Sequence, residues 1–119
     1  MDEGPRIVAV DDDEELRRLM VAILRRFIGS VHSFRSASSA WEYMRTSPVD
    51  ILVSDVDMDG MGGLELLARV KQEFPKVRCV IVSGNPCHER PAMKSGADAF
   101  LSKPFRTREL IEALGVGSR

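Results

Sequence analysis

Residues that could bind a metal ion or a phosphoryl group stand directly after short apolar runs. Four such runs are followed or ended by Asp11 to Asp13, Asp55, Ser83 and Lys103. Carboxylates that are brought together repel one another, so they need protons or a cation to neutralise them. Carboxylate and carbonyl oxygens suit a small, hard divalent ion, with Mg²⁺ the leading candidate. A lysine and a hydroxyl facing that ion would bind the remaining oxygens of a tetrahedral anion, which indicates a phosphoryl site.

These residues can meet only if the apolar runs are parallel strands of one sheet. The runs are short, and apolar residues at helical spacing separate them, which predicts strands at 6–10, 31–34, 51–55, 77–82 and 99–102. Strands that alternate with helices form a parallel sheet that is covered on both faces. We therefore expect a three-layer α/β/α sandwich, with the polar residues at the carboxyl edge of its sheet, where ligands bind in such folds.

The helices between these strands are predicted from apolar spacing and from capping residues. The first covers Leu16 to Phe27 and ends at Gly29, and the acids at 13–15 suit its positive N-terminal end. A Ser-x-x-Glu pattern at Ser39 and Glu42 predicts the start of the second helix.

The later helices follow from the same signals. The third should end at Pro75 and present one apolar face, formed by Leu64, Leu67, Ala68 and Phe74. Pro86 and Pro91 predict a fourth helix that is short or irregular. The last helix is expected at 107–114.

Length and composition favour a single domain that folds by itself. The chain has 119 residues, of which 44% are hydrophobic and 29% charged. We assign 1–119 to one domain, with its core at about 6–114 and a tail or linker at 115–119. The net charge of −1 argues against nucleic-acid binding. The longest apolar run, Leu19 to Leu24, is far shorter than a membrane span, so we expect a cytoplasmic domain.

The cysteines and histidines have ordinary structural interpretations. Cys79 and Cys87 are too few for a disulfide framework and lack Cys-x-x-Cys spacing. His32 and His88 have no third ligand at metal spacing, so we expect them to be solvated or locally hydrogen-bonded.

Taken in this order and on these strands, the motifs resemble those of response-regulator receiver domains. They are Val-Asp-Asp-Asp at 10–13, Ser-Asp-Val-Asp-Met-Asp-Gly-Met-Gly-Gly at 54–63, Ile-Val-Ser-Gly at 81–84, Gly-Ala-Asp-Ala-Phe-Leu at 96–101 and Lys-Pro-Phe at 103–105. The resemblance covers essentially all of residues 6–114. It implies a five-stranded parallel sheet of flavodoxin-like order 2-1-3-4-5.

The resemblance also implies what the polar residues do. Asp55 is expected to be the phosphoacceptor, and Ser83 and Lys103 are expected to bind phosphoryl oxygens. The metal is expected to be Mg²⁺, with Mn²⁺ as an alternative, and no other cofactor is expected. The expected protein ligands of the metal are Asp11, Asp12, Asp55 and the backbone carbonyl of Asp57.

The implied function is signalling by phosphorylation rather than catalytic turnover. A sensor histidine kinase or a histidine phosphotransfer protein is expected to supply the phosphoryl group, with intrinsic Mg²⁺-dependent autophosphorylation and autodephosphorylation. Ser83 and Phe100 are expected to act as the switch that changes the face formed by the fourth helix, fifth strand and fifth helix. The downstream partner stays open.

The acidic residues allow three other interpretations. The run from Asp55 to Gly60 resembles an EF-hand loop, but Leu66 stands where the terminal Glu is needed. Asp55-Val-Asp57 also resembles the Asp-x-Asp of haloacid-dehalogenase-like phosphatases, whose nucleophile strand comes first in the chain. An aspartyl-phosphate phosphatase therefore stays a minor alternative. A pseudo-receiver, which binds partners without phosphorylation, is the main one.

Overall fold

The computed structural model describes residues 4–115, which form a five-stranded sheet covered by helices. The strands are β1 (Arg6–Val10), β2 (Ser30–Phe34), β3 (Ile51–Asp55), β4 (Arg78–Ser83) and β5 (Ala99–Ser102). The helices are α1 (Glu14–Phe27), α2 (Ala37–Thr46), α3 (Gly63–Glu73), α4 (Glu89–Lys94) and α5 (Thr107–Ala113), with a 3₁₀ turn, η1 (Pro86–His88), before α4. The expected tail beyond residue 115 lies outside the described residues.

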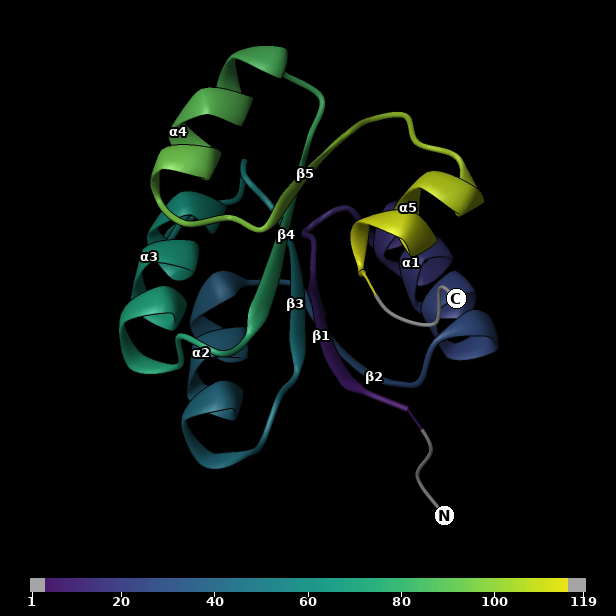
Figure 1. Ribbon diagram of the computed structural model, residues 1–119, viewed down its shortest axis with the longest axis horizontal. Coiled ribbons are helices and arrows are strands. Elements are labelled where there is room, and N and C mark those ends of the chain that lie inside the picture. The colour runs from purple at the N-terminus through teal and green to yellow at the C-terminus, as the bar shows by residue number, and fades with distance from the viewer. Residues whose placement is uncertain (1–3, 116–119) are drawn as a thin grey trace.

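All strands of the sheet are parallel, in the order β2-β1-β3-β4-β5. The sheet is seen edge-on in Figure 1, with α2, α3 and α4 on one side and α1 and α5 on the other. This confirms the predicted three-layer sandwich and its strand order. None of the helices among residues 4–115 has the length and apolar character that crossing a bilayer requires.

Each strand supplies side chains to two separate cores, because successive residues of a strand face opposite sides of the sheet. Val8 and Val10 belong to the core under α2 and α3. Ile7 and Ala9 belong to the core under α1 and α5. All five residues of β3 are buried, as expected for a strand at the centre of a covered parallel sheet. Asp55 is therefore the last residue of a strand that is buried along its whole length.

The start of α2 differs from the prediction. Ser36 caps the helix by accepting a hydrogen bond from the Ser39 amide, so the helix begins three residues earlier than the Ser39 pattern indicated. The early start places Ala37 in line with Ala40 and Met44 on the buried face. Ala37 and Ala40 are both fully buried. Their packing in the core therefore favours a helix that begins at Ala37.

Two predicted apolar faces are also partly wrong. Leu19 and Phe27 of α1 are about half exposed, at 51% and 53%, while Met20, Ile23 and Leu24 form the buried face. On α3, Ala68 is exposed and Leu66 is fully buried. The fourth helix is short, as predicted, with six residues after η1.

Candidate functional site

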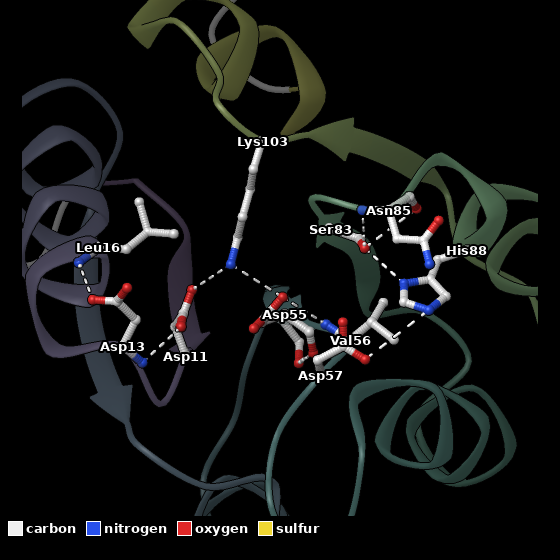
Figure 2. Close-up of polar contacts among 11 residues, drawn as sticks. Asp11, Asp13, Leu16, Asp55, Val56, Asp57, Ser83, Asn85, His88 and Lys103 are labelled. Carbon is white, nitrogen blue, oxygen red and sulfur yellow. Dashed lines mark hydrogen bonds and ion pairs between the residues drawn. The ribbon is translucent and has the colours of Figure 1, made fainter.

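The carboxyl ends of β1, β3, β4 and β5 bring the predicted polar residues to one edge of the sheet. Asp11 follows β1, Asp55 ends β3, Ser83 ends β4 and Lys103 follows β5. In Figure 2 the Lys103 side chain extends between Asp11 and Asp55, and Ser83 lies on the far side of Asp55. Residues that are 92 positions apart in the chain therefore become neighbours.

Lys103 connects the two buried carboxylates of the site. Its Nζ lies 3.2 Å from Asp55 Oδ1 and 3.3 Å from Asp11 Oδ2. Asp11 is fully buried and Asp55 is only 6% exposed. Buried carboxylates are costly unless they are paired, so one ammonium group shared between two of them leaves the site short of positive charge.

The backbone after β1 holds Asp11 in place. Asp11 Oδ1 accepts a hydrogen bond from the Asp13 amide at 2.9 Å. Arg17 donates to the Asp11 carbonyl at 2.8 Å. Asp13 itself caps α1 by accepting from the Leu16 amide, which confirms the expected role of these acids at the helix start. Asp13 and Asp11 thus lie in one loop, where Asp13 caps the helix and Asp11 provides the buried carboxylate of the site.

Charge and burial shift the pKa values of the central pair. Burial raises the pKa of Asp55 above its ordinary value; Lys103 acts in the opposite direction and Asp11 in the same one. Burial alone would lower the pKa of Lys103, but the carboxylates of Asp11 and Asp55 outweigh it and raise that pKa. Lys103 therefore stays charged, and an ionised Asp55 calls for more positive charge than Lys103 provides.

Three carboxylates of the site could together hold a metal ion. Asp11, Asp12 and Asp55 each offer one oxygen, and these oxygens lie within 4.8 Å of one another. Oxygen donors of this kind suit Mg²⁺ or Mn²⁺. The donor set therefore fits the predicted metal, and the shortage of positive charge around Asp55 and Asp11 gives the site a reason to bind one.

Close approach of α3 to the end of β3 depends on Gly63. A Cβ atom on Gly63 would lie 1.9 Å from the Asp55 carbonyl oxygen and 2.8 Å from its carbonyl carbon. The Gly63 amide donates to the Val56 carbonyl at 2.9 Å. A residue without a side chain therefore lets the first turn of α3 pack directly on the backbone of Asp55.

His88 makes a local hydrogen bond, as expected, but its partner is Ser83, so the structure also brings His88 into the site. His88 Nδ1 lies 2.7 Å from the Ser83 hydroxyl oxygen. Its Nε2 lies 4.0 Å from Asp57 Oδ1. Figure 2 shows the imidazole ring between Ser83 and Asp57. The signal for this contact was the Asn85-Pro86 pair, which starts a tight turn after β4 and returns the chain towards its end.

The remaining predicted residues lie at the margins of the site. The Asp57 side chain is largely exposed, so the carboxylate does not join the buried cluster. Phe100 is partly buried and packs against the core on the α2–α3–α4 side of the sheet. Ile81 pairs with Phe100, and Ser83 stands two residues further along β4. Because side chains alternate along strands, Ser83 and Phe100 lie on the same face.

Comparison with known sequences gives a match over nearly the whole chain. Residues 7–115 match the family described as response regulator receiver domain. Response regulator receiver protein CpdR of Brucella abortus is 31% identical over 116 residues, which cover 92% of this chain and 92% of the relative. C4-dicarboxylate transport transcriptional regulatory protein DctD of Rhizobium meliloti is also 31% identical and covers 95% of this chain. The chain spans only 25% of DctD, and less than half of several further curated relatives.

The fold is likewise shared with solved structures. The signal receiver domain of an HD domain-containing protein from Pseudomonas fluorescens Pf-5 superposes with a TM-score of 0.88 at 28% identity. That alignment covers 95% of this chain and 93% of the other.

Proposed function

Because the chain belongs to the response-regulator receiver domain family, we propose that Asp55 accepts a phosphoryl group from a sensor histidine kinase or a histidine phosphotransfer protein. The observation that carries this proposal is the position of Lys103, whose Nζ lies 3.2 Å from Asp55 and 3.3 Å from Asp11. A charged lysine beside a buried carboxylate, at the carboxyl edge of a parallel sheet, suits a site that receives an anion.

The proposed transfer uses the Asp55 carboxylate as the nucleophile. One of its oxygens attacks phosphorus, an O–P bond forms, and the P–N bond to the donor histidine breaks with the electron pair left on the imidazole. With acetyl phosphate, a P–O bond breaks instead and acetate leaves. Negative charge spreads over the three equatorial oxygens in the transition state, and Lys103 is close enough to neutralise part of it.

The metal ligands in this proposal are Asp11, Asp12, Asp55 and the backbone carbonyl of Asp57. Mg²⁺, or Mn²⁺ in its place, supplies positive charge to the phosphoryl oxygens when it is bound. The convergence of three carboxylate oxygens supports this assignment. Asp11 and Asp55 also remain paired with Lys103, so the lysine and the carboxylates orient each other before the donor arrives.

The proposed output is a change at the face formed by α4, β5 and α5. A phosphoryl group on Asp55 adds negative charge and acceptor oxygens, to which the Ser83 hydroxyl can donate. When Ser83 moves, it vacates space on the face of the sheet that it shares with Phe100. Phe100 then turns inward to fill that space, which changes the outer surface that a downstream partner contacts.

Phosphorylation of the purified protein tests the proposal. Intact-mass measurement after incubation with acetyl phosphate or phosphoramidate should show one added phosphoryl group with Mg²⁺ and none with a chelator. Asp55→Asn should show none. Asp59→Asn changes an exposed acid of the same loop and should be modified like the wild type.

Two other outcomes would favour the alternatives. A wild-type protein that stays unmodified with every donor, in the presence of Mg²⁺, would refute the proposal and favour a phosphorylation-independent interaction module. Repeated turnover of a phosphate ester such as p-nitrophenyl phosphate would favour a phosphatase.

A further inference from the structure

The hydroxyl group of Ser83 is engaged by the chain segment that follows it rather than by the phosphoacceptor. Ser83 Oγ accepts a hydrogen bond from the Asn85 amide at 3.0 Å and lies 2.7 Å from His88 Nδ1. Ser83 is 1% exposed, so it cannot replace these partners with bulk water. In Figure 2 the dashed lines from this hydroxyl lead to Asn85 and His88, and none leads to Asp55.

The single hydroxyl proton of Ser83 has two acceptors within reach. His88 Nδ1 lies at 2.7 Å and the Asn85 carbonyl at 3.4 Å, so the shorter and stronger bond is the one to His88. If Nδ1 accepts that proton, the neutral ring carries its own hydrogen on Nε2. Nε2 is the atom that faces the Asp57 carboxylate at 4.0 Å, where an N–H is favoured over a lone pair. The Asp57 carboxylate therefore favours the tautomer in which Nδ1 can accept the Ser83 proton.

The backbone of η1 holds His88 in this place. The His88 amide donates to the Asn85 carbonyl at 3.0 Å. The Asn85 side chain accepts from the Cys87 amide at 2.9 Å, and Pro86 occupies the first turn. Because α4 begins at Glu89, the residue that contacts Ser83 is the last one before this helix.

We propose that His88 is a positioning residue that competes with the phosphoryl group for the Ser83 hydroxyl proton. This inference rests on the proposed function of Asp55. In the unmodified protein Ser83 donates to His88. After transfer, Ser83 donates to a phosphoryl oxygen instead, and η1 loses its side-chain bond to β4. His88 thus stabilises the unmodified state and couples the acceptor site to the start of α4.

The competition has a measurable consequence. Loss of the His88 acceptor removes a hydrogen bond from the unmodified state only, which should favour the phosphorylated state by about two- to ten-fold. The probe is beryllofluoride with Mg²⁺, a non-covalent analogue of the phosphoryl group, titrated while amide NMR spectra are recorded. His88→Ala should bind it about two- to ten-fold more tightly than the wild type.

Three further variants separate this role from a structural one. His88→Asn keeps a polar atom at the δ position and should restore affinity towards that of the wild type. In a Ser83→Ala background, His88→Ala should have no further effect. His32→Ala is the matched control, because His32 also bonds a side chain, Tyr43, but lies on the edge strand β2. It should bind beryllofluoride like the wild type.

A spectroscopic readout of the unmodified protein tests the hydrogen bond itself. In ¹⁵N-histidine NMR spectra at one mildly alkaline pH, His88 should show the Nε2–H tautomer with a hydrogen-bonded Nδ1. Ser83→Ala should shift the His88 Nδ1 resonance and leave His32 unchanged, and beryllofluoride should produce a similar shift in the wild type. An insensitive Nδ1 resonance, or equal affinities of His88→Ala and the wild type, would overturn the role of His88 alone. A wild type that does not bind beryllofluoride would overturn the proposed function and this inference with it.

Discussion

Replacement of Gly63 by alanine tests whether the close contact between α3 and β3 positions Asp55, the proposed phosphoacceptor. The added Cβ would lie 1.9 Å from the Asp55 carbonyl oxygen, whereas ordinary contacts begin at 3.4 Å. The two backbone segments must therefore separate by about 1.5 Å, unless the strain is spread over neighbouring residues. The clash is between the alanine Cβ and the backbone of Asp55, so no side-chain rotation can relieve it.

The expected loss of stability follows from two opposing effects. Overpacking of a well-packed region costs about 1–3 kcal/mol. Alanine in a helix gains up to about 1 kcal/mol over glycine. Because the clash is with backbone, we expect a net loss of about 2 kcal/mol in the free energy of unfolding. This loss should lower the urea midpoint by about 1 M.

The same substitution should also slow phosphorylation. A displacement of about 1 Å at a reacting group can reduce the rate by about 100-fold. This rate is measured by intact-mass analysis during phosphorylation by acetyl phosphate. The buffer contains no urea, and the temperature is one at which the variant is folded. We expect Gly63→Ala to be slowed by at least about 10-fold, because part of the shift falls on the helix rather than on Asp55.

Gly84→Ala is the matched control for stability. Gly84 lies at the same edge of the sheet, but its Cβ would lie 3.9 Å from the nearest atom, on Lys103. Its urea midpoint should stay close to that of the wild type. If Gly63→Ala unfolded at the same urea concentration as Gly84→Ala and was phosphorylated at the wild-type rate, the contact between α3 and Asp55 would have no positioning role.

Two further predictions concern the carboxylates of Asp55, which is buried, and Asp98, which is exposed. In metal-free buffer at neutral pH, Asp55→Asn should raise the free energy of unfolding by about 1 kcal/mol. Because burial raises the folded-state pKa of Asp55, ionisation of this carboxyl group destabilises the fold as pH rises through that pKa. Urea unfolding should therefore show no stability gain of Asp55→Asn over the wild type below about pH 4. Burial alone would raise the pKa of Asp98 too, but hydrogen bonds from Lys71 and the Cys79 amide lower it. Asp98→Ala should therefore lower the free energy of unfolding by about 1 kcal/mol at neutral pH. This loss should shrink as pH falls through the folded-state pKa of Asp98. An equal loss at neutral pH and below that pKa would contradict the assignment.

Most of the fold could be predicted because the apolar runs of a covered parallel sheet are nearly continuous. The runs ending at Val10 and Asp55 contain few polar residues, so their boundaries coincide with those of β1 and β3. Once the strands are parallel, their carboxyl ends share an edge, and the meeting of Asp11, Asp55 and Lys103 follows from topology. The family resemblance added the strand order, which spacing alone does not give.

The features that were missed depend on packing, which selects among the local signals that the sequence offers. Ser36 and Ser39 are both suitable caps, and the choice between them rests on the burial of Ala37, which is too small to stand out as an apolar signal. The place of His88 depends on the path of a tight turn, because only that path returns its side chain to Ser83. Spacing in the sequence shows neither.

The two ends of α4 are attached to the rest of the molecule very differently. At the C-terminal end, the amides of Gly96 and Ala97 bond back to the helix. The Asp98 amide then donates to the Cys79 carbonyl, and the Asp98 carboxylate accepts from the Cys79 amide and pairs with Lys71 of α3. The N-terminal end is tied to the sheet through Ser83.

This asymmetry makes α4 a short lever whose pivot is its C-terminal end. A helix of six residues is about 9 Å long, so a displacement of about 1 Å at its N-terminal end corresponds to a rotation of about 6°. If Ser83 releases His88 on phosphorylation, as we propose, a linear movement at the end of β4 would become a change in the angle of α4. The exposed residues of η1 would then move furthest, and those beside Asp98 least.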